Sequence, residues 1–245
     1  FALIMFTVIV IAMIASFQRE SVETLSEKFS GGFEIIGYTL REVPEDNLTA
    51  AVENVTASLQ TDVIQRVEVA STAYVTMSVQ GSDESVTRML IGFSDQMLED
   101  GRFSLAQRAE GYGSDEEAWR DLLVNPGLTI LDGSVVASMF AVSAGTWYVS
   151  VGDVVTVTSA AGTSANLTVI GIMDQILVNG AFSTKAFVDA HATGAMDNLL
   201  YVDTVAGTGI ADEAVMEELE RGLAEFGMNG IVVKDLVGEA MAMTS

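Results

Sequence analysis

The chain opens with an uncharged, mostly apolar run, residues 1–18, that contains neither Gly nor Pro. As a helix the run would be roughly 26 Å long, close to the roughly 30 Å thickness of a bilayer's hydrocarbon core. It is apolar on every side, so it has no polar face to present to water. A buried core helix and a secretory signal peptide are the alternatives, but no basic segment precedes the run and no small-residue cleavage site follows it. We therefore expect a transmembrane helix whose beginning precedes Phe1.

All the charge lies in the 227 residues that follow (245 minus 18). The chain has 34 acidic and 11 basic residues, a net charge of −23. This charge excludes a nucleic-acid backbone as a partner and disfavours docking on anionic lipid headgroups. The chain has no Cys, which excludes disulfides and thiolate zinc sites. The composition indicates a well-solvated domain at a membrane surface, with enough residues for a sizeable core.

Two strand–helix–strand patterns lie near the ends of this domain. After a polar helical stalk over residues 19–30, in which Val22, Leu25 and Phe29 share one face, Gly31 and Gly32 end the helix. The first pattern then predicts a strand over 33–38, a helix from Pro44 to about Gln60 and a long strand over 64–80. The second predicts a strand over 198–203, a helix over 209–226 ended by Gly227, and a strand over 229–234. We expect these four strands to share one sheet in an α+β domain.

The middle of the chain, roughly residues 88–193, has the pattern of an inserted β-rich subdomain. Ser114 and Glu117 form a capping-box pattern that predicts the start of a helix. Residues 128–132 are typical of a buried strand. Strands over 154–158 and 166–173, separated by Gly162, predict a β-hairpin. From residue 236 a helical pattern begins, and we expect it to lead back towards the bilayer.

Residues that carry enzyme chemistry are scarce. His191 is the single histidine, and with no Cys it leaves little scope for Ser-His-Asp or Cys-His machinery, so we interpret it as a surface or capping residue. The acidic clusters lack the spacing of a calcium loop and are best interpreted as solvated faces. There is no phosphate-binding loop, so any ATP hydrolysis would belong to another subunit. We predict no catalytic, metal or cofactor site.

Five stretches resemble the extracytoplasmic part of FtsX/MacB-type ABC transporter permeases and the membrane helix before it; this family includes the lipoprotein-releasing (LolC-type) permeases. They are the apolar run 1–18 and residues 99–103 (Glu-Asp-Gly-Arg-Phe), 128–134, 151–157 (Val-Gly-Asp-Val-Val-Thr-Val) and 167–172 (Leu-Thr-Val-Ile-Gly-Ile). The last two are the most specific, because the family often carries a similar hairpin. The family-motif residues, which we expect to be structural, are Gly101, Arg102, Phe103, Gly152, Asp153, Gly162 and Gly171. The acidic stretch from Arg108 to Arg120 departs from the family pattern.

The resemblance implies a porter-like subdomain interrupted by a sabre-like one. On this view residues 19–87 hold the stalk and the first half of the porter-like subdomain, 88–193 the sabre-like insertion, 194–235 the second half, and 236–245 the approach to the next membrane helix. The resemblance implies a permease subunit in the cell membrane with residues 19–245 extracytoplasmic. It also implies two partners, a cytoplasmic ATPase subunit and a second permease copy or paralogue, and a role in coupling ATP hydrolysis to substrate handling or export.

A ligand-sensing ectodomain of a membrane receptor is the alternative, because such domains are also flanked by two membrane helices. The sequence after Ser245 would separate the two: further membrane helices favour a permease, and a signalling module favours a receptor. Three sequons, at Asn47, Asn54 and Asn166, permit N-glycosylation if the domain faces a glycosylating compartment.

Overall fold

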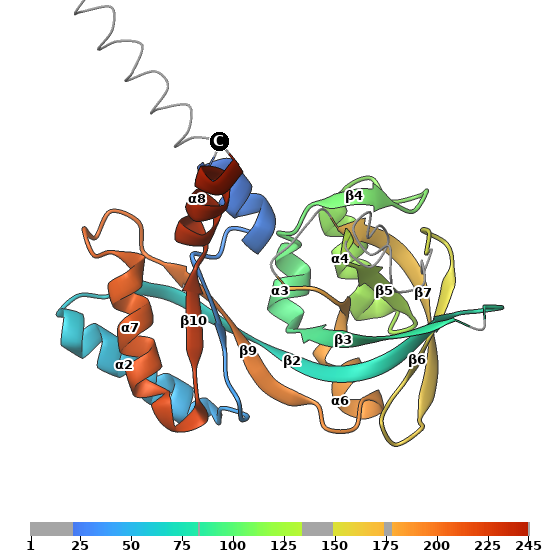
Figure 1. Cartoon of the computed structure of the whole chain (residues 1–245), viewed down its shortest axis with the longest axis horizontal. Coiled ribbons are helices and arrows are strands. Elements are labelled where there is room, and N and C mark those ends of the chain that lie inside the picture. Colours follow the sequence, from blue (N-terminus) through green and yellow to red (C-terminus); the bar gives the residue numbers. More distant parts are fainter. Residues whose placement is uncertain (1–21, 83, 134–148, 174–177, 245) are drawn as a thin grey trace, which may run out of the picture.

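The computed structural model describes residues 22–82, 84–133, 149–173 and 178–244 (Figure 1). The predicted transmembrane helix over residues 1–18 lies outside this set. Within the described residues, no helix combines the length and the apolar character needed to span a bilayer. The described residues form a mixed α and β fold with one large mixed sheet. This confirms the prediction that the domain combines helices and a sheet.

The four strands predicted at the two ends of the domain lie side by side, in the order β10 (Asn229–Val232), β1 (Ile35–Tyr38), β9 (Met196–Thr204) and β2 (Ile64–Val79). Each neighbour pair is antiparallel. The strands therefore do share one sheet, but each βαβ unit is split, because β9 lies between β1 and β2 and β1 lies between β9 and β10. This interlocked order is that of a ferredoxin-like split βαβ arrangement.

Two helices cover one face of this half, α2 (Glu45–Leu59) and α7 (Asp212–Gly222). Strand residues alternate between faces, so one face contributes Ile35, Leu200 and Val202 to a core shared with both helices. The helices pack closely, since a Cβ on Gly222 would lie 3.1 Å from the Cβ of Ala51. The second helix is shorter than the predicted 209–226: it ends at Gly222, and a 3₁₀ turn (Ala224–Phe226) follows before Gly227 in the left-handed conformation.

The inserted residues form a closed barrel with the far end of β2. The pairing runs from β2 through β3 (Ser85–Phe93), β8 (Ala181–Thr184), β5 (Leu128–Leu131), β7 (Ser164–Met173) and β6 (Val154–Thr158) back to β2. β9 pairs with β2 as far as Thr72, and β6 takes the same edge from Thr76. The barrel interior is filled by apolar side chains that alternate along its strands: Val75, Met77, Leu90, Leu131, Val155, Val157, Leu167, Val169 and Ala181.

Shorter elements close the barrel and join it to the other half. α6 (Lys185–His191) packs Phe187 and Val188 against the barrel core. β4 (Leu105–Arg108) pairs antiparallel with the end of β7. α3 (Asp95–Asp100) and α4 (Asp115–Val124) pack on the outside of β3, β5 and β7. Ser114 caps α4 as predicted, accepting a hydrogen bond from the N–H of Glu117, but the Glu117 carboxylate accepts from Gly113 rather than from Ser114.

The first and last helices of the described residues lie side by side. Residues 22–30 are helical, and α8 (Val233–Thr244) begins directly after β10 (Figure 1). The predicted strand over 229–234 is therefore too long, and the exit helix starts at Val233 rather than near Leu236. The predicted stalk face, Val22, Leu25 and Phe29, packs against the same core as Val237 and Met241 of α8.

Candidate functional site: the joint between the two halves

Five charged side chains meet where β2 and β9 of the split βαβ half face the end of α3. We call this cluster the arginine joint: Arg66 and Glu68 from β2, Asp203 from β9, Asp100 from the last turn of α3, and Arg102 from the loop after it. Arg66 and Asp203 face each other across the β2–β9 pair. Gly101 ends α3 in the left-handed conformation (φ 56°), which turns the chain so that Arg102 points back towards the sheet.

The two arginines share the two aspartates. Arg66 donates to Asp100 at 2.6 Å and to Asp203 at 3.1 Å, and Arg102 donates to Asp203 at 2.9 Å. The Nε atom of Arg102 also lies 3.6 Å from Asp100. The Asp203 side chain is only 7% exposed. Because each guanidinium holds carboxylates from both halves, the cluster is a cross-link between the split βαβ half and the insertion.

Phe33 connects this joint to the helix over residues 22–30. The guanidinium carbons of Arg102 and Arg66 lie 4.8 Å and 5.6 Å from the centre of the Phe33 ring, in cation–π contact. Two residues earlier, Gly31 (φ 67°) runs against Phe103, whose ring a Cβ at this position would approach to 3.0 Å. The residues that follow the helix over 22–30 therefore contact both the split βαβ half, through Arg66, and the insertion, through Arg102 and Phe103.

A cluster of aromatic rings packs beneath the joint and also crosses between the halves. Phe93 lies between Phe103, Phe182 and Trp119 of the insertion and Tyr201 of β9, with ring centres 5.0–5.8 Å apart. The indole N–H of Trp119 donates to the Phe103 carbonyl at 2.8 Å. Burial raises the pKa of Tyr201 far above its ordinary value, so its hydroxyl stays neutral.

The pKa values of Asp100 and Arg66 at the joint are shifted in the directions that keep both groups charged. Burial alone would raise the pKa of Asp100 and lower that of Arg66. The hydrogen bond between them acts together with the other nearby opposite charges, and their sum exceeds the effect of burial, so the pKa of Asp100 is lowered and that of Arg66 is raised. Both groups therefore stay charged through the neutral range, and neither is suited to exchange protons with a substrate there.

A second ionic cluster crosses the halves at the other end of the β2–β9 pair. Lys185 of α6 donates to Asp197 of β9 at 2.5 Å, to Asp189 at 3.0 Å and to the hydroxyl oxygen of Ser71 on β2 at 2.9 Å. A lysine beside a serine could in principle form a catalytic dyad. Burial alone would lower the pKa of Lys185, but the hydrogen bonds with Asp197 and Asp189 raise it. A lysine held charged in this way cannot serve as the base, so the cluster is structural.

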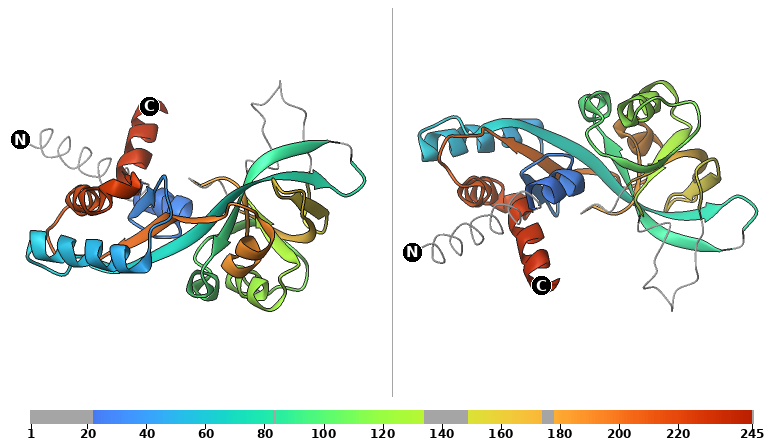
Figure 2. Two further views of the ribbon diagram at one scale, coloured as in Figure 1. Left: turned by 90° about the horizontal axis from the view of Figure 1, so that it is seen from below. Right: turned by 90° about the horizontal axis from the view of Figure 1, so that it is seen from above.

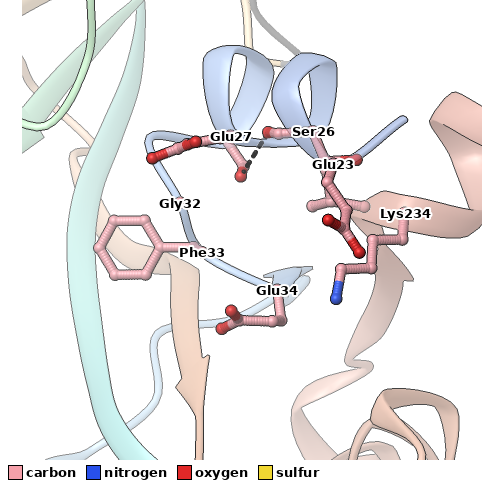
Figure 3. Close-up of a pocket in the computed structure, with 9 residues that line it drawn as sticks. Glu23, Ser26, Glu27, Gly32, Phe33, Glu34 and Lys234 are labelled. Atoms are coloured by element: carbon pink, nitrogen blue, oxygen red, sulfur yellow. Dashed lines mark hydrogen bonds between the residues drawn. The ribbon is translucent and has the colours of Figure 1, made fainter. Parts of the chain in front are cut away.

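A cavity of about 280 Å³ lies between the helix over 22–30 and the start of α8 (Figure 3). Figure 3 shows Glu23 and Glu27 on the helix, Glu34 on the chain that follows it and Lys234 on the opposite wall. Glu34 accepts a hydrogen bond from the N–H of Thr204 at 2.9 Å. Burial raises the pKa of Glu34, as do Asp203 and Asp212 nearby, although its backbone hydrogen bonds act in the opposite direction. The described residues include no cluster of carboxylates and imidazole arranged to hold a metal ion.

The structure separates the seven family-motif residues into two groups. Gly101, Arg102 and Phe103 lie at the joint. Gly152, Asp153, Gly162 and Gly171 lie in the barrel, where Asp153 accepts from the N–H of Ser150 and Gly162 turns the β6–β7 hairpin. The sequence pattern did not identify Asp100 and Asp203 as partners of Arg102, nor Arg66 as the second arginine that binds them. His191 is the last residue of α6; its ring stacks on that of Phe187 at 4.3 Å, and its Nδ1 lies 3.0 Å from the Phe187 carbonyl oxygen.

No protein-family model matches the sequence, and no curated protein matches it. Among solved structures, the chain is similar to the periplasmic region of MacB from Actinobacillus actinomycetemcomitans, with 15% identity, a TM-score of 0.45 and coverage of 87% of this chain and 95% of that one. It is also similar to the extracellular domain of the noncanonic ABC-type transporter YknZ from Gram-positive bacteria, with 14% identity, a TM-score of 0.42 and coverage of 80% and 98%.

Proposed function

We propose that this chain is the extracytoplasmic domain of an ABC transporter permease subunit and that it transmits motion between the membrane and the domain's far end. ATP hydrolysis belongs to a separate cytoplasmic subunit, and this chain is not an enzyme. Residues 19–245 lie outside the cytoplasm, and the run over residues 1–18 anchors them in the cell membrane. A second permease copy or paralogue completes the transporter.

The packing of both connecting helices onto one core carries the proposal. Val22, Leu25 and Phe29 of the entry helix and Val237 and Met241 of the exit helix all contact the cluster that contains Phe33, Phe93 and Trp119. If either helix is displaced, it therefore pushes or pulls on packed side chains that belong to both halves. Packed elements of this kind move as rigid bodies between discrete arrangements rather than deforming continuously.

We assign the two halves of the structure to the two subdomains that the resemblance implies. The split βαβ half corresponds to the porter-like parts proposed for residues 19–87 and 194–235, and the barrel and its outer helices to the sabre-like part proposed for 88–193. The arginine joint and the Lys185 cluster tie the second part to the first. In this arrangement the barrel is an arm that follows the movement of the split βαβ half.

Inserting Gly-Gly between Ser21 and Val22 tests the proposal in the complete transporter. Each Gly disfavours a helix by roughly 1 kcal/mol and adds a flexible joint, so the insertion should uncouple the domain while leaving it folded. The measurement is substrate transport and stimulated ATPase activity, with the thermal melt as a check on folding. The matched control inserts Gly-Gly between Gly162 and Thr163, in an open hairpin turn. Unchanged activity with the first insertion would favour a passive tether.

A further inference from the structure

Each of the three Asn-X-Thr sequons in the chain has its asparagine at the surface. Asn47 and Asn54 are exposed on α2, and Asn166 is exposed on β7 in the β6–β7 hairpin. Seven residues make nearly two helical turns, so Asn47 and Asn54 share one flank of α2. The Asn-X-Thr pattern is the acceptor of N-linked glycans on proteins that meet a glycosylating compartment.

The amide nitrogens that would carry a glycan are free or weakly held. The Oδ1 atom of Asn166 accepts from the Thr156 hydroxyl at 2.8 Å, which leaves the amide nitrogen of Asn166 without a bond within the described residues. The same is true of the Asn54 amide nitrogen in that part of the chain. The Asn47 amide donates to the exposed Glu225 carboxylate at 3.4 Å, which is long for a hydrogen bond.

A buried asparagine of the same chain shows the contrast. Asn198 is fully buried, accepts a hydrogen bond from the Thr72 hydroxyl and donates to the Thr39 carbonyl. It is not in a sequon, because Leu200 stands where the pattern requires a hydroxyl residue. The sequons therefore lie where a glycan displaces no buried contact.

The backbone at Asn166 presents its sequon in the folded state. Residues two apart lie on the same side of a strand, so Asn166 and Thr168 of β7 face one way. β5 pairs with β7 only from Thr168 onwards. Within the described residues, the β7 edge beside Asn166 and away from β6 therefore has no strand partner.

The two sequons of α2 are presented differently. Residues two apart are about 200° apart around a helix, so Asn54 and Thr56 project from different sides. A transferase that recognises both side chains together therefore needs this segment before the helix forms, while the chain is being synthesised. Asn47 lies in the first turn of α2, where helix ends fray, so it is less constrained than Asn54.

We propose that Asn47, Asn54 and Asn166 are N-glycosylation sites. The amide nitrogen forms a bond to the anomeric carbon of a sugar that is carried on a membrane lipid phosphate. The bond between that carbon and the phosphate oxygen breaks, and the lipid phosphate leaves with the proton that the amide gives up. The inference rests on the proposed function in one respect, that residues 19–245 lie outside the cytoplasm.

Peptide mass spectrometry of the full-length protein, isolated from its native membrane, measures the sugar at each site. Thr56→Ala removes the acceptor pattern and should lower the occupancy of Asn54 at least about tenfold, whereas Thr56→Ser keeps the pattern and should leave it within about twofold. The same pairs of changes at Thr49 and Thr168 test Asn47 and Asn166. An asparagine that is unmodified in the unaltered protein would overturn the assignment of that site, and sugar that persists in the alanine variants would overturn the proposed chemistry.

A second measurement separates this inference from the proposed function. Val124→Cys introduces the single thiol of these residues, at a position that is 76% exposed on α4. A membrane-impermeant maleimide labels it in intact cells only if the domain lies outside the cytoplasm. A labelled chain whose three sequon asparagines carry no sugar would contradict the glycosylation alone. A chain labelled only after cell lysis would contradict the extracytoplasmic location, and the glycosylation with it.

Discussion

Asp203 is the residue on which the arginine joint most depends. Its two oxygens accept separately from Arg66 and Arg102, which belong to different halves of the molecule, and its side chain is almost fully buried. Removing one partner of a buried ion pair costs more than the pair itself contributes, because the remaining charges stay desolvated without compensation. Here a single truncation leaves two guanidinium groups with one fewer carboxylate between them.

We predict that Asp203→Ala lowers the free energy of unfolding by about 2–4 kcal/mol, because it breaks two charge-assisted hydrogen bonds to a carboxylate that is almost fully buried. The matched control is Arg221→Ala, which removes an arginine that is 68% exposed from its pair with Glu218 and should cost about 0.5 kcal/mol or less. Urea denaturation of both variants measures the difference. Equal losses in the two variants would mean that the joint contributes no more than a surface pair.

Glu34 gives a prediction about pH. Its pKa is raised above the ordinary value of 4.5, chiefly by burial, so the folded state favours the protonated form. Its contribution to stability is then present below pH 4.5 and is lost as the pH rises through the raised pKa. Glu34→Gln keeps an acceptor for the Thr204 N–H, so it should stabilise the chain at neutral pH and have little effect near pH 4.5. Denaturation curves at both pH values check this, and a loss of stability at neutral pH would contradict it.

At the scale of elements, β2 is the strand that organises the molecule. It pairs with β9 through its first half, with β3 through its second half and with β6 at its end, so it belongs to both the split βαβ sheet and the barrel (Figure 2). Residues without a bulky side chain allow the flanking helices to approach β2 and its neighbour β3. Gly92 on β3, for example, lies against α6, where a Cβ would come within 2.7 Å of the Lys185 Cα.

Gly101 sets the position of α3 against α4 and of Arg102 in the joint. Its φ of 56° is unfavourable for any residue with a side chain, and a Cβ there would lie 2.6 Å from the Glu116 Cα. Gly101→Ala should therefore cost about 2–4 kcal/mol, from backbone strain and from overpacking together. Gly127→Ala is the control, because Gly127 has an ordinary φ and open space around it. Thermal melts compare the two, and equal melting temperatures would show that the helices shift freely.

The sequence predicted the elements of the split βαβ half better than their order in the sheet. Apolar periodicity identified the helix now seen as α2 and strands β1, β2 and β9, because a strand or helix that buries one face must repeat its apolar residues at the period of that structure. Local pattern does not say which strand lies between two others, so the interleaving of the two units was not predicted. β4 and β8 are four residues each, too short for a periodic signal.

The joint was only partly predictable. Arg102 was identified through a resemblance, with Gly101 and Phe103 beside it. Of its two partners, Asp100 lies in an acidic cluster that we interpreted as a solvated face, and no pattern pointed to Asp203. One local signal was available: Arg66 and Glu68 occupy alternate positions of a strand whose other members are mostly apolar, which suggests charges held on one covered face. The remaining partners, Asp100 and Asp203, are 34 and 137 positions from Arg66, so only the fold brings them together.

At the scale of the whole molecule, the chain is two packed halves with one shared strand, one shared aromatic core and ionic clusters at both ends of their junction. The two connecting helices enter at the same core. If this arrangement transmits motion, the halves must keep a fixed mutual position while the helices move. The central claim is therefore that the split βαβ half and the barrel form one rigid body.

A distance distribution between spin labels on the two halves tests this claim most directly. Labels at Ser58→Cys on α2 and Val124→Cys on α4 report on both halves, and the absence of native Cys makes these the only labelled positions. We predict one narrow distribution in the otherwise unaltered chain and a broader or shifted one when Asp203→Ala is added. A broad distribution already present without the Asp203 substitution would contradict a rigid junction and, with it, the proposed transmission of motion.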